Sequence, residues 1–227
     1  MSRINYIPAS LVPVSYGLLY NGHTILDSRN LAAAGWHVIT RSEIITLLSV
    51  YDSTPLYGTL YECSHKLNEA GTIHWNNAFS NNESGLSFVG NGFRESEAAP
   101  SDYYNFRTSC HLWTSTLTGA YLYNVISQNQ SSTQYVTTQA DFLGRGLGVR
   151  LVRDTASIAP GQVGFYTGNN GKKYTSMLFA GLEILTTNLI ETRFRNGDLI
   201  PFIEDQTAWR ALTSAAYCFA NGDPANQ

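Results

Sequence analysis

The chain has 227 residues, of which 43% are hydrophobic and only 14% are charged. An average soluble domain carries roughly 25% charged residues, so this chain must expose mainly neutral polar groups. Its hydrophobic fraction is enough for a packed core. The formal net charge of −3, without any cluster of Lys and Arg, argues against a nucleic-acid partner. Neutral polar surfaces of this kind are common in proteins that work outside cells or in virions.

The sequence shows no targeting signal. Its first residues lack the basic segment and apolar run of a signal peptide, and no stretch approaches the roughly 20 apolar residues of a membrane span. Three cysteines, Cys63, Cys110 and Cys218, cannot all pair within the chain, and their spacing fits neither a zinc site nor a CxxC redox pair. We therefore expect buried free thiols in a protein that is assembled in a bacterial cytoplasm, without membrane insertion, and released by lysis.

Two segments carry helix signals. Thr40 and Glu43 are placed as in a capping box, and apolar residues then recur at helical spacing, so residues 41–51 are predicted to form a helix packed on a sheet. A second, shorter amphipathic run begins near Asp205 and contains Trp209. The second segment is a candidate for another short helix.

The rest of the chain is typical of short strands and long loops, because apolar or alternating runs are separated by Gly, Asn and Ser. Asn170 and Gly171 stand between two such runs and predict a type I′ turn, in which both central residues have positive φ. Residues 76–111 are expected to be rich in loops, and residues 155–161 are the one linker candidate. The predicted strands are residues 118–126, 147–153, 162–167, 172–179 and 182–187.

Six sequence blocks then follow one another between residues 16 and 154 in an order that resembles a known family. The blocks are YGLLYN (16–21), LAAAGWHVITRSE (31–43), HKLNEAGTIHWN (65–76), NESGLSFVGNGFR (82–94), LWTSTLTGAYLYNV (112–125) and GLGVRLVRD (146–154). They resemble the Fibrobacter succinogenes major paralogous domain, which occurs in bacterial surface proteins and phage fibres. The resemblance implies an α+β fold, similar to C-type lectins and formylglycine-generating enzymes, with twisted antiparallel sheets, two main helices and long loops.

The order of the segments departs from the family pattern. Residues 169–226 resemble the segment that usually precedes the first block, but here they come last. The resemblance therefore implies that residues 1–157 form the main body of the domain. Residues 158–227 would supply its front half, either within the same chain or in another copy. Such a permuted order is similar to that of phage tail proteins.

Two further departures concern tryptophan. Gly22 and His23 stand where the family usually has a Trp, and Ile184 stands in a hairpin that often carries one, so the family's packing cannot be carried over in detail. The tryptophans that are present are expected in the core, because large aromatic side chains bury the most apolar area. They are Trp36, Trp75, Trp113 and Trp209.

Enzyme motifs are not found. The five histidines are scattered, and none belongs to an HExxH helix or another metal motif. Formylglycine-generating enzymes use a pair of cysteines, and this sequence has no closely spaced pair. Cys110 and His111 are neighbours, but neighbours on a strand point to opposite faces. We expect no catalytic residue, no cofactor and no metal site, and calcium has no support because no DxDxDG run occurs.

Binding is predicted for a polar, aromatic segment, Pro100 to Thr118, with its neighbours in 121–137. Tyr offers broad contact area at small entropic cost, and Asn and Gln offer adaptable hydrogen bonds. An alternative of equal weight is that these are solvated loops and outer strand faces. The candidate ligand-binding residues are Tyr103, Tyr104, Asn105, Phe106, Arg107, Tyr121, Tyr123 and Asn129.

Three functions remain open at this stage. The first is a non-enzymatic receptor-binding or adhesion module of a phage tail fibre or similar extracellular particle, which recognises a bacterial surface glycan or protein. The second is a purely structural virion protein, such as a fibre or capsid decoration, and the third is an enzyme of the formylglycine-generating type. In the first two cases we expect a homo-oligomer whose partners are other virion or fibre subunits.

Overall fold

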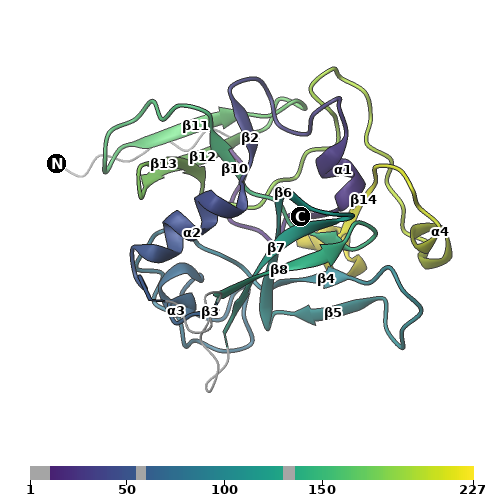
Figure 1. Ribbon diagram of the computed structural model, residues 1–227, viewed down its shortest axis with the longest axis horizontal. Helices are drawn as coiled ribbons and strands as arrows, with labels where there is room; N and C mark the ends of the chain where they lie inside the picture. The colour runs from purple at the N-terminus through teal and green to yellow at the C-terminus, as the bar shows by residue number, and fades with distance from the viewer. Residues whose placement is uncertain (1–10, 55–59, 130–135) are drawn as a thin grey trace.

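The computed structural model describes residues 11–54, 60–129 and 136–227, which form fourteen strands in three antiparallel sheets. Helices are few and short (Figure 1). The longest, α2, has nine residues, and the helix near Asp205 has only five. The expected α+β fold of the C-type-lectin kind, with two main helices, is therefore wrong, and the fold is mainly β. The described residues contain no helix long and apolar enough to cross a membrane.

The first sheet has the strand order β14-β1-β9-β4-β5. Strand β1 pairs with the edge strand β14 on one side, where Leu19 lies opposite Cys218, and with β9 on the other, where Tyr20 lies opposite Leu147. The sheet therefore joins the two ends of the sequence. Its strands are β1 (Leu18–Asn21), β4 (Asn91–Arg94), β5 (Tyr103–Phe106), β9 (Gly146–Leu147) and β14 (Tyr217–Phe219).

The second sheet has the order β11-β12-β13-β10-β2 and the third the order β3-β8-β7-β6. Figure 1 shows the second sheet above α2 and the third sheet below and beside it. The strands of the second sheet are β2 (Trp36–Val38), β10 (Leu151–Arg153), β11 (Val163–Thr167), β12 (Lys173–Phe179) and β13 (Leu182–Leu185). Those of the third are β3 (Leu60–Tyr61), β6 (Ser109–Thr118), β7 (Tyr121–Gln128) and β8 (Val136–Phe142).

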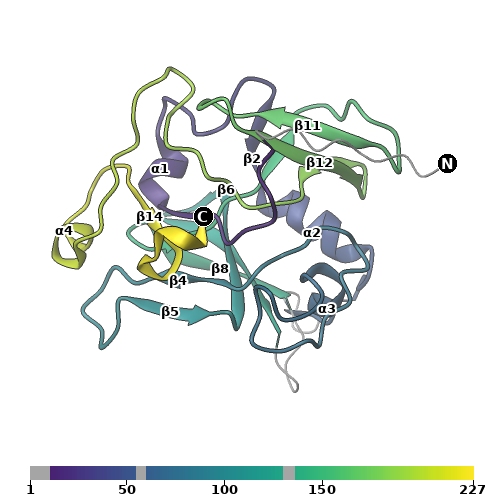
Figure 2. The ribbon, with the colours of Figure 1, turned by 180° about the vertical axis from the view of Figure 1, so that it is seen from behind.

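The helix predicted at residues 41–51 is confirmed as α2, Arg41–Ser49. Its capping box is complete, because the Glu43 amide donates to the Thr40 side chain and the Thr40 amide donates to the Glu43 carboxylate. The helix buries Ile44, Leu47 and Leu48 against the third sheet. The other helices are α1 (Gly22–Leu26), α3 (Ser64–Leu67) and α4 (Gln206–Arg210), with 3₁₀ turns at Ala220–Gly222 and Pro224–Asn226. Figure 2 shows these last turns close to β14 and β4.

The type I′ turn lies at another position than the predicted one. Asn170 has no positive φ, and the Gly171 amide donates to the Gly168 carbonyl inside a longer loop between β11 and β12. The two-residue turn with positive φ at both centres is Ala180-Gly181, with φ of 52° and 80°, between β12 and β13.

The strand predictions are right where alternation is clear and wrong where strands are short. The three C-terminal predictions correspond to β11, β12 and β13. The predicted strand 118–126 is interrupted by the turn at Gly119, and 147–153 is divided between β9 and β10. Residues 76–111 hold β4, β5 and the start of β6, which the loop prediction missed.

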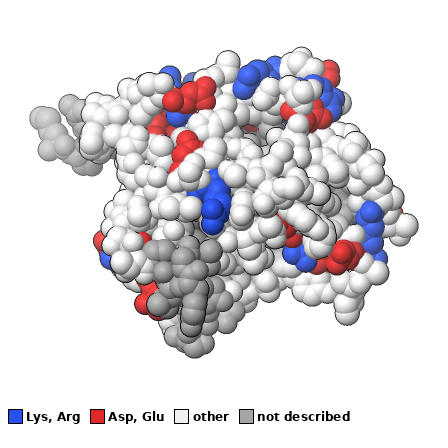
Figure 3. Space-filling view, viewed as in Figure 1, with Lys and Arg blue, Asp and Glu red and all other residues white. Residues whose placement is uncertain are grey.

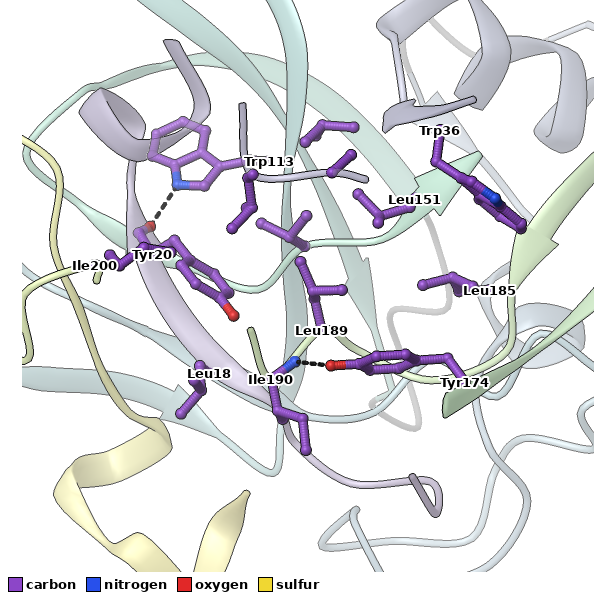
Figure 4. Close-up of a cluster of buried hydrophobic side chains, with 14 of the residues drawn as sticks. Leu18, Tyr20, Trp36, Trp113, Leu151, Tyr174, Leu185, Leu189, Ile190 and Ile200 are labelled. Carbon is purple, nitrogen blue, oxygen red and sulfur yellow. Dashed lines mark hydrogen bonds between the residues drawn. The ribbon is translucent and has the colours of Figure 1, made fainter. Parts of the chain in front are cut away.

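The tryptophans lie in the core, as predicted. Each is at most 6% exposed, and the Trp113 indole donates to the Tyr20 carbonyl at 2.7 Å (Figure 4). In the same cluster, the Tyr174 hydroxyl accepts a hydrogen bond from the Ile190 amide. The predicted free, buried thiols are also confirmed for Cys63, Cys110 and Cys218.

Two buried arginines join the parts of the chain on either side of Ser157. Arg94 in β4 donates to the Ile203 carbonyl at 2.6 Å, and Arg150 donates to the Asn188 side chain at 2.7 Å. A buried cation is costly unless it is fully hydrogen-bonded. These contacts therefore fix the two parts of the chain relative to each other.

Candidate functional site

The predicted binding residues divide into three places in the fold. Five of them, Tyr103 to Arg107, lie on or just after the edge strand β5 of the first sheet. Tyr121 and Tyr123 lie on β7 in the third sheet. Asn129 is fully buried, where it accepts from Ser80 and donates to a loop carbonyl, so its side chain has no free surface for a ligand.

Most side chains of the β5 group make contacts within the fold. Tyr103 packs against Gly222 and Arg94, and burial raises the pKa of its hydroxyl. Arg107 donates to two loop carbonyls at 2.6 and 3.0 Å. Phe106 packs on Tyr16 with ring centroids 4.6 Å apart.

The two remaining β5 residues are freer. Tyr104 is half-buried and stacks on Phe93 with ring centroids 5.6 Å apart, and its hydroxyl accepts a hydrogen bond from the Ser101 amide. Asn105 is exposed at a φ of 58°. These two side chains are the part of the β5 group that a ligand can reach most easily.

The β7 residues form an exposed surface that we call the aromatic ladder, defined by Tyr121, Tyr123, Phe142 and Arg41. Tyr121 lies opposite Phe142 in the register of β7 and β8, with ring centroids 5.2 Å apart. Their exposed fractions are 40% and 44%. Arg41 lies over the Tyr123 ring at 4.4 Å from its centroid. Side chains two residues apart on a strand share a face, so these groups present one continuous surface.

One face of the molecule carries little charge. Figure 3 shows this face mostly white, with Lys, Arg, Asp and Glu in small separate groups. This agrees with the charged content of 14%. A ligand on this face would be held by aromatic contact and neutral hydrogen bonds more than by long-range charge attraction.

A buried ion cluster stands between the first and third sheets. Arg145 bonds Glu95 at 3.0 Å and Asp141 at 2.8 Å, and the Asn124 amide donates to Asp141. Burial raises the pKa of Asp141. In contrast to the ladder, the two carboxylates are buried and Arg145 is only partly exposed, and the side chains link the residue after β4 with the end of β8.

Cys110 and His111 do not form a reactive pair. Burial raises the pKa of the Cys110 thiol to about 12 and lowers the pKa of His111 to about 3. The thiol is therefore protonated and the imidazole neutral at neutral pH. Within the described ranges, no three His, Cys, Asp or Glu side chains are grouped in a way that could hold a metal ion.

A polar cavity of about 270 Å³ opens beside β2, and we call it the β2 cavity. Its residues come from separate segments of the chain, so no local sequence pattern predicts it. Its wall includes an aromatic, two cationic and two further polar side chains. These are Trp36, His37, Arg195, Asn30 and Asp154.

His37 is the electrostatic centre of this cavity wall. Its Nδ1 lies 2.7 Å from Asp154 and its Nε2 lies 3.0 Å from Glu43. The hydrogen bond to Glu43, supported by the one to Asp154, raises the pKa of His37 to about 9. Burial alone would raise the pKa of Glu43, but hydrogen bonds from His37 and Thr40 lower it. His37 is therefore a cation held between two carboxylates at neutral pH.

A second, more apolar hollow of about 400 Å³ lies on the β11-β12-β13 face, where Val163 and Met177 are among its lining residues. The neighbouring edge strand β11 exposes Val163 and Phe165 at 62% and 53%. An exposed apolar edge strand can pair with another chain.

Comparison with known proteins gives one match. The family model described as Fibrobacter succinogenes major domain matches residues 12–153, which is more than half of the chain. No curated protein and no solved structure matches the chain. The matched range contains the aromatic ladder and most of the β2 cavity, whereas Asp154, Arg195 and the edge strand β11 lie beyond it.

Proposed function

The chain belongs to the Fibrobacter succinogenes major domain family, and from this premise we propose that it is a receptor-binding module. The module would be displayed on an extracellular particle such as a phage tail fibre, and it would recognise a bacterial surface glycan or protein. It would act without catalysis and assemble as a homo-oligomer with other fibre subunits.

The aromatic ladder is the observation that carries this proposal. Tyr121 and Phe142 are large, exposed and fixed by their cross-strand contact, so binding them costs little side-chain entropy. Arg41 beside them is held by a hydrogen bond from its Nε to the Thr138 hydroxyl at 3.1 Å. Tyr and Arg on a rigid scaffold are the residue types that most often dominate binding energy.

The chemistry of the interior also favours binding over catalysis. Burial raises the pKa of Cys63 to about 12 and that of Cys218 to about 11, so neither thiol is ionised at neutral pH. A thiol reacts as its thiolate, and these environments suppress that form. A formylglycine-generating activity, which needs a reactive cysteine pair, therefore has no support from these side chains.

Cell adsorption tests the proposal. Labelled protein is incubated with a panel of Gram-negative and Gram-positive cells, and the double variant Tyr121→Ala, Tyr123→Ala is compared with Phe79→Ala. Phe79 is also an exposed aromatic residue but lies in a loop outside the three sheets, which makes it a matched control. We expect the wild type and the control to bind at least one strain saturably, and the double variant to lose most of that binding.

The proposal fails if the wild type binds none of these cells at saturation, or if the double variant binds as well as the control. Circular dichroism and thermal melting of each variant show whether a loss of binding reflects a loss of folding. Tyr121 is exposed and Tyr123 is half-buried, so we expect their replacement to change the melting temperature little.

The structural virion role has one specific observation in its favour, the exposed apolar edge of β11. Pairing of this edge with a second copy would cover Val163 and Phe165 and continue the second sheet across the interface. Analytical ultracentrifugation of the wild type and of the Phe165→Lys variant distinguishes the structural role from the receptor-binding role. Self-association that this variant abolishes, in a protein that binds no cells, would favour the structural role.

A further inference from the structure

We propose that the β2 cavity binds one neutral sugar unit of a bacterial surface glycan. The proposal rests on the proposed function only for the source of the sugar, because the site is defined by its own geometry. It is separate from the aromatic ladder, since it opens between β2, the loop at Asn30 and the segment at Arg195.

The size of the cavity suits a single ring. Drug-sized ligands occupy pockets of roughly 300 to 1,000 Å³, and the β2 cavity, at about 270 Å³, lies just below that range. Apolar side chains, Ile25 and Leu31, share the wall with the polar groups. A pyranose presents both C–H faces and hydroxyl edges, so it matches a wall of this mixed character.

The wall of the cavity offers both hydrogen-bond donors and hydrogen-bond acceptors. The indoles of Trp75, Trp113 and Trp209 donate to backbone carbonyls, but the Trp36 indole has no acceptor among the described residues. The Trp36 Nε1 atom is not one of the buried polar atoms that lack a partner, so it is open to solvent. Trp36 lines the cavity, so a ligand there could accept this bond in place of water.

Further donors and acceptors complete the set. Arg195 uses Nε and Nη2 to bind the carbonyls of Ala32 and Ala33, which fixes the guanidinium and leaves Nη1 for a ligand. Asp154 uses one oxygen for His37, and its other oxygen is free to accept. A hydroxyl both donates and accepts, so vicinal hydroxyls of a sugar satisfy such a mixed wall.

The charges around the cavity indicate a neutral ligand. The two cations, His37 and Arg195, are balanced by the two anions, Asp154 and Glu43. Each carboxylate is already within hydrogen-bond distance of His37, at 2.7 and 3.0 Å. An anionic sugar would gain no net attraction from this balanced set, whereas a neutral sugar keeps the existing ion pairs intact.

The Trp36 indole offers a direct readout. We would titrate ¹⁵N-labelled full-length protein with glucose, galactose, mannose and N-acetylglucosamine and follow the four indole N–H signals by NMR. The Trp36 signal is assigned with the Trp36→Phe variant. We expect at least one sugar to shift the Trp36 signal saturably, with about millimolar affinity for a single sugar unit. The other three indoles, bonded to carbonyls, serve as internal controls.

Two variants remove polar groups from the cavity wall. Asp154→Asn and Asn30→Gly should each lower the affinity for the sugar at least tenfold. Glycine at position 30 accepts the φ of 60° found there. Asp102→Asn is the matched control, because Asp102 has a similarly exposed side chain outside the cavity. The proposal is overturned if no sugar moves the Trp36 signal selectively, or if both cavity variants bind as the control does.

The outcomes separate this proposal from the proposed function. A saturable Trp36 shift in a protein that adsorbs to none of the cells would leave the sugar site standing and remove the receptor role. Cell adsorption together with a flat titration for all four sugars would remove the sugar site alone.

Discussion

Trp113 shows how one residue can stabilise two parts of the core. It is fully buried, and its indole N–H donates to the Tyr20 carbonyl in the neighbouring sheet. Trp113→Ala should lower the free energy of unfolding by about 3 to 5 kcal/mol, since it leaves a cavity as well as an unpaired carbonyl. Urea unfolding measures this change. Trp113→Phe should lose less, and an unchanged midpoint for the alanine variant would contradict the core assignment.

His37 makes stability depend on pH. Its pKa is about 9 in the folded chain, against 6.5 for a free histidine, so its stabilising effect is complete below about pH 6.5 and is lost as the pH rises through about 9. Because a third of the side chain is exposed, solvent screening reduces the effect to about 1 to 2 kcal/mol. Chemical unfolding between these pH values should show this decrease.

His37→Gln is the control for the pH effect. Glutamine keeps hydrogen-bonding capacity toward Glu43 and Asp154 but does not titrate, so the variant should have a flatter stability profile over the same pH window. An equal slope in wild type and variant would show that another group causes the pH dependence.

Among the elements, the β12-β13 hairpin contains a residue that its turn does not favour. Ala180 has a φ of 52°, a conformation that costs an L-residue other than Asn or Asp roughly 1 to 2 kcal/mol. Ala180→Asn gives the Asn-Gly pair that type I′ turns prefer, so it should raise the free energy of unfolding by up to about 1 kcal/mol. Ala180→Val should lower it, because a β-branched side chain is disfavoured at positive φ. Thermal melting of both variants gives the comparison.

Local patterns explain which elements could be predicted. The capping box and spacing of α2 lie within a few residues of one another, so the sequence alone was enough to place that helix. In contrast, β4 and β9 are short and contain glycine, and their pairing depends on distant strands. The type I′ turn was misplaced because Asn-Gly is the stronger local signal, although the register of β12 and β13 puts the turn at Ala180.

The candidate functional residues were also only partly predictable from the sequence. Tyr121 and Tyr123 were predicted from composition, and both face outward on β7. The β2 cavity needs Asn30, Asp154 and Arg195 to meet, and nothing in their sequence spacing indicates that they do. A site made of single residues from several segments becomes visible only after the sheets have formed.

At the level of the whole molecule, the sequence on the two sides of Ser157 is interwoven. Strand β14 pairs with β1 in the first sheet, and β13 pairs with β10 in the second. The Tyr20 hydroxyl donates to the Glu191 carbonyl at 2.8 Å, and the Asn188 amide donates to the Tyr16 carbonyl at 2.9 Å. Both sheets would therefore lose strands, and the core would lose buried hydrogen bonds, if the chain were divided there.

Truncation at Ser157 tests whether the two parts form one cooperative unit. A fragment of residues 1–157 would expose one side of β1 and of β10. It would also remove the Ile203 and Glu204 carbonyls from Arg94, and the Leu185 carbonyl and the Asn188 side chain from Arg150. A buried charge without its partners is strongly destabilising, so this fragment should be unfolded or insoluble alone. It should regain structure when residues 158–227 are added as a separate polypeptide, as circular dichroism and gel filtration would show. A soluble fragment of residues 1–157 with its own cooperative melt would instead mean two independent domains, and the permuted single-domain interpretation would fail.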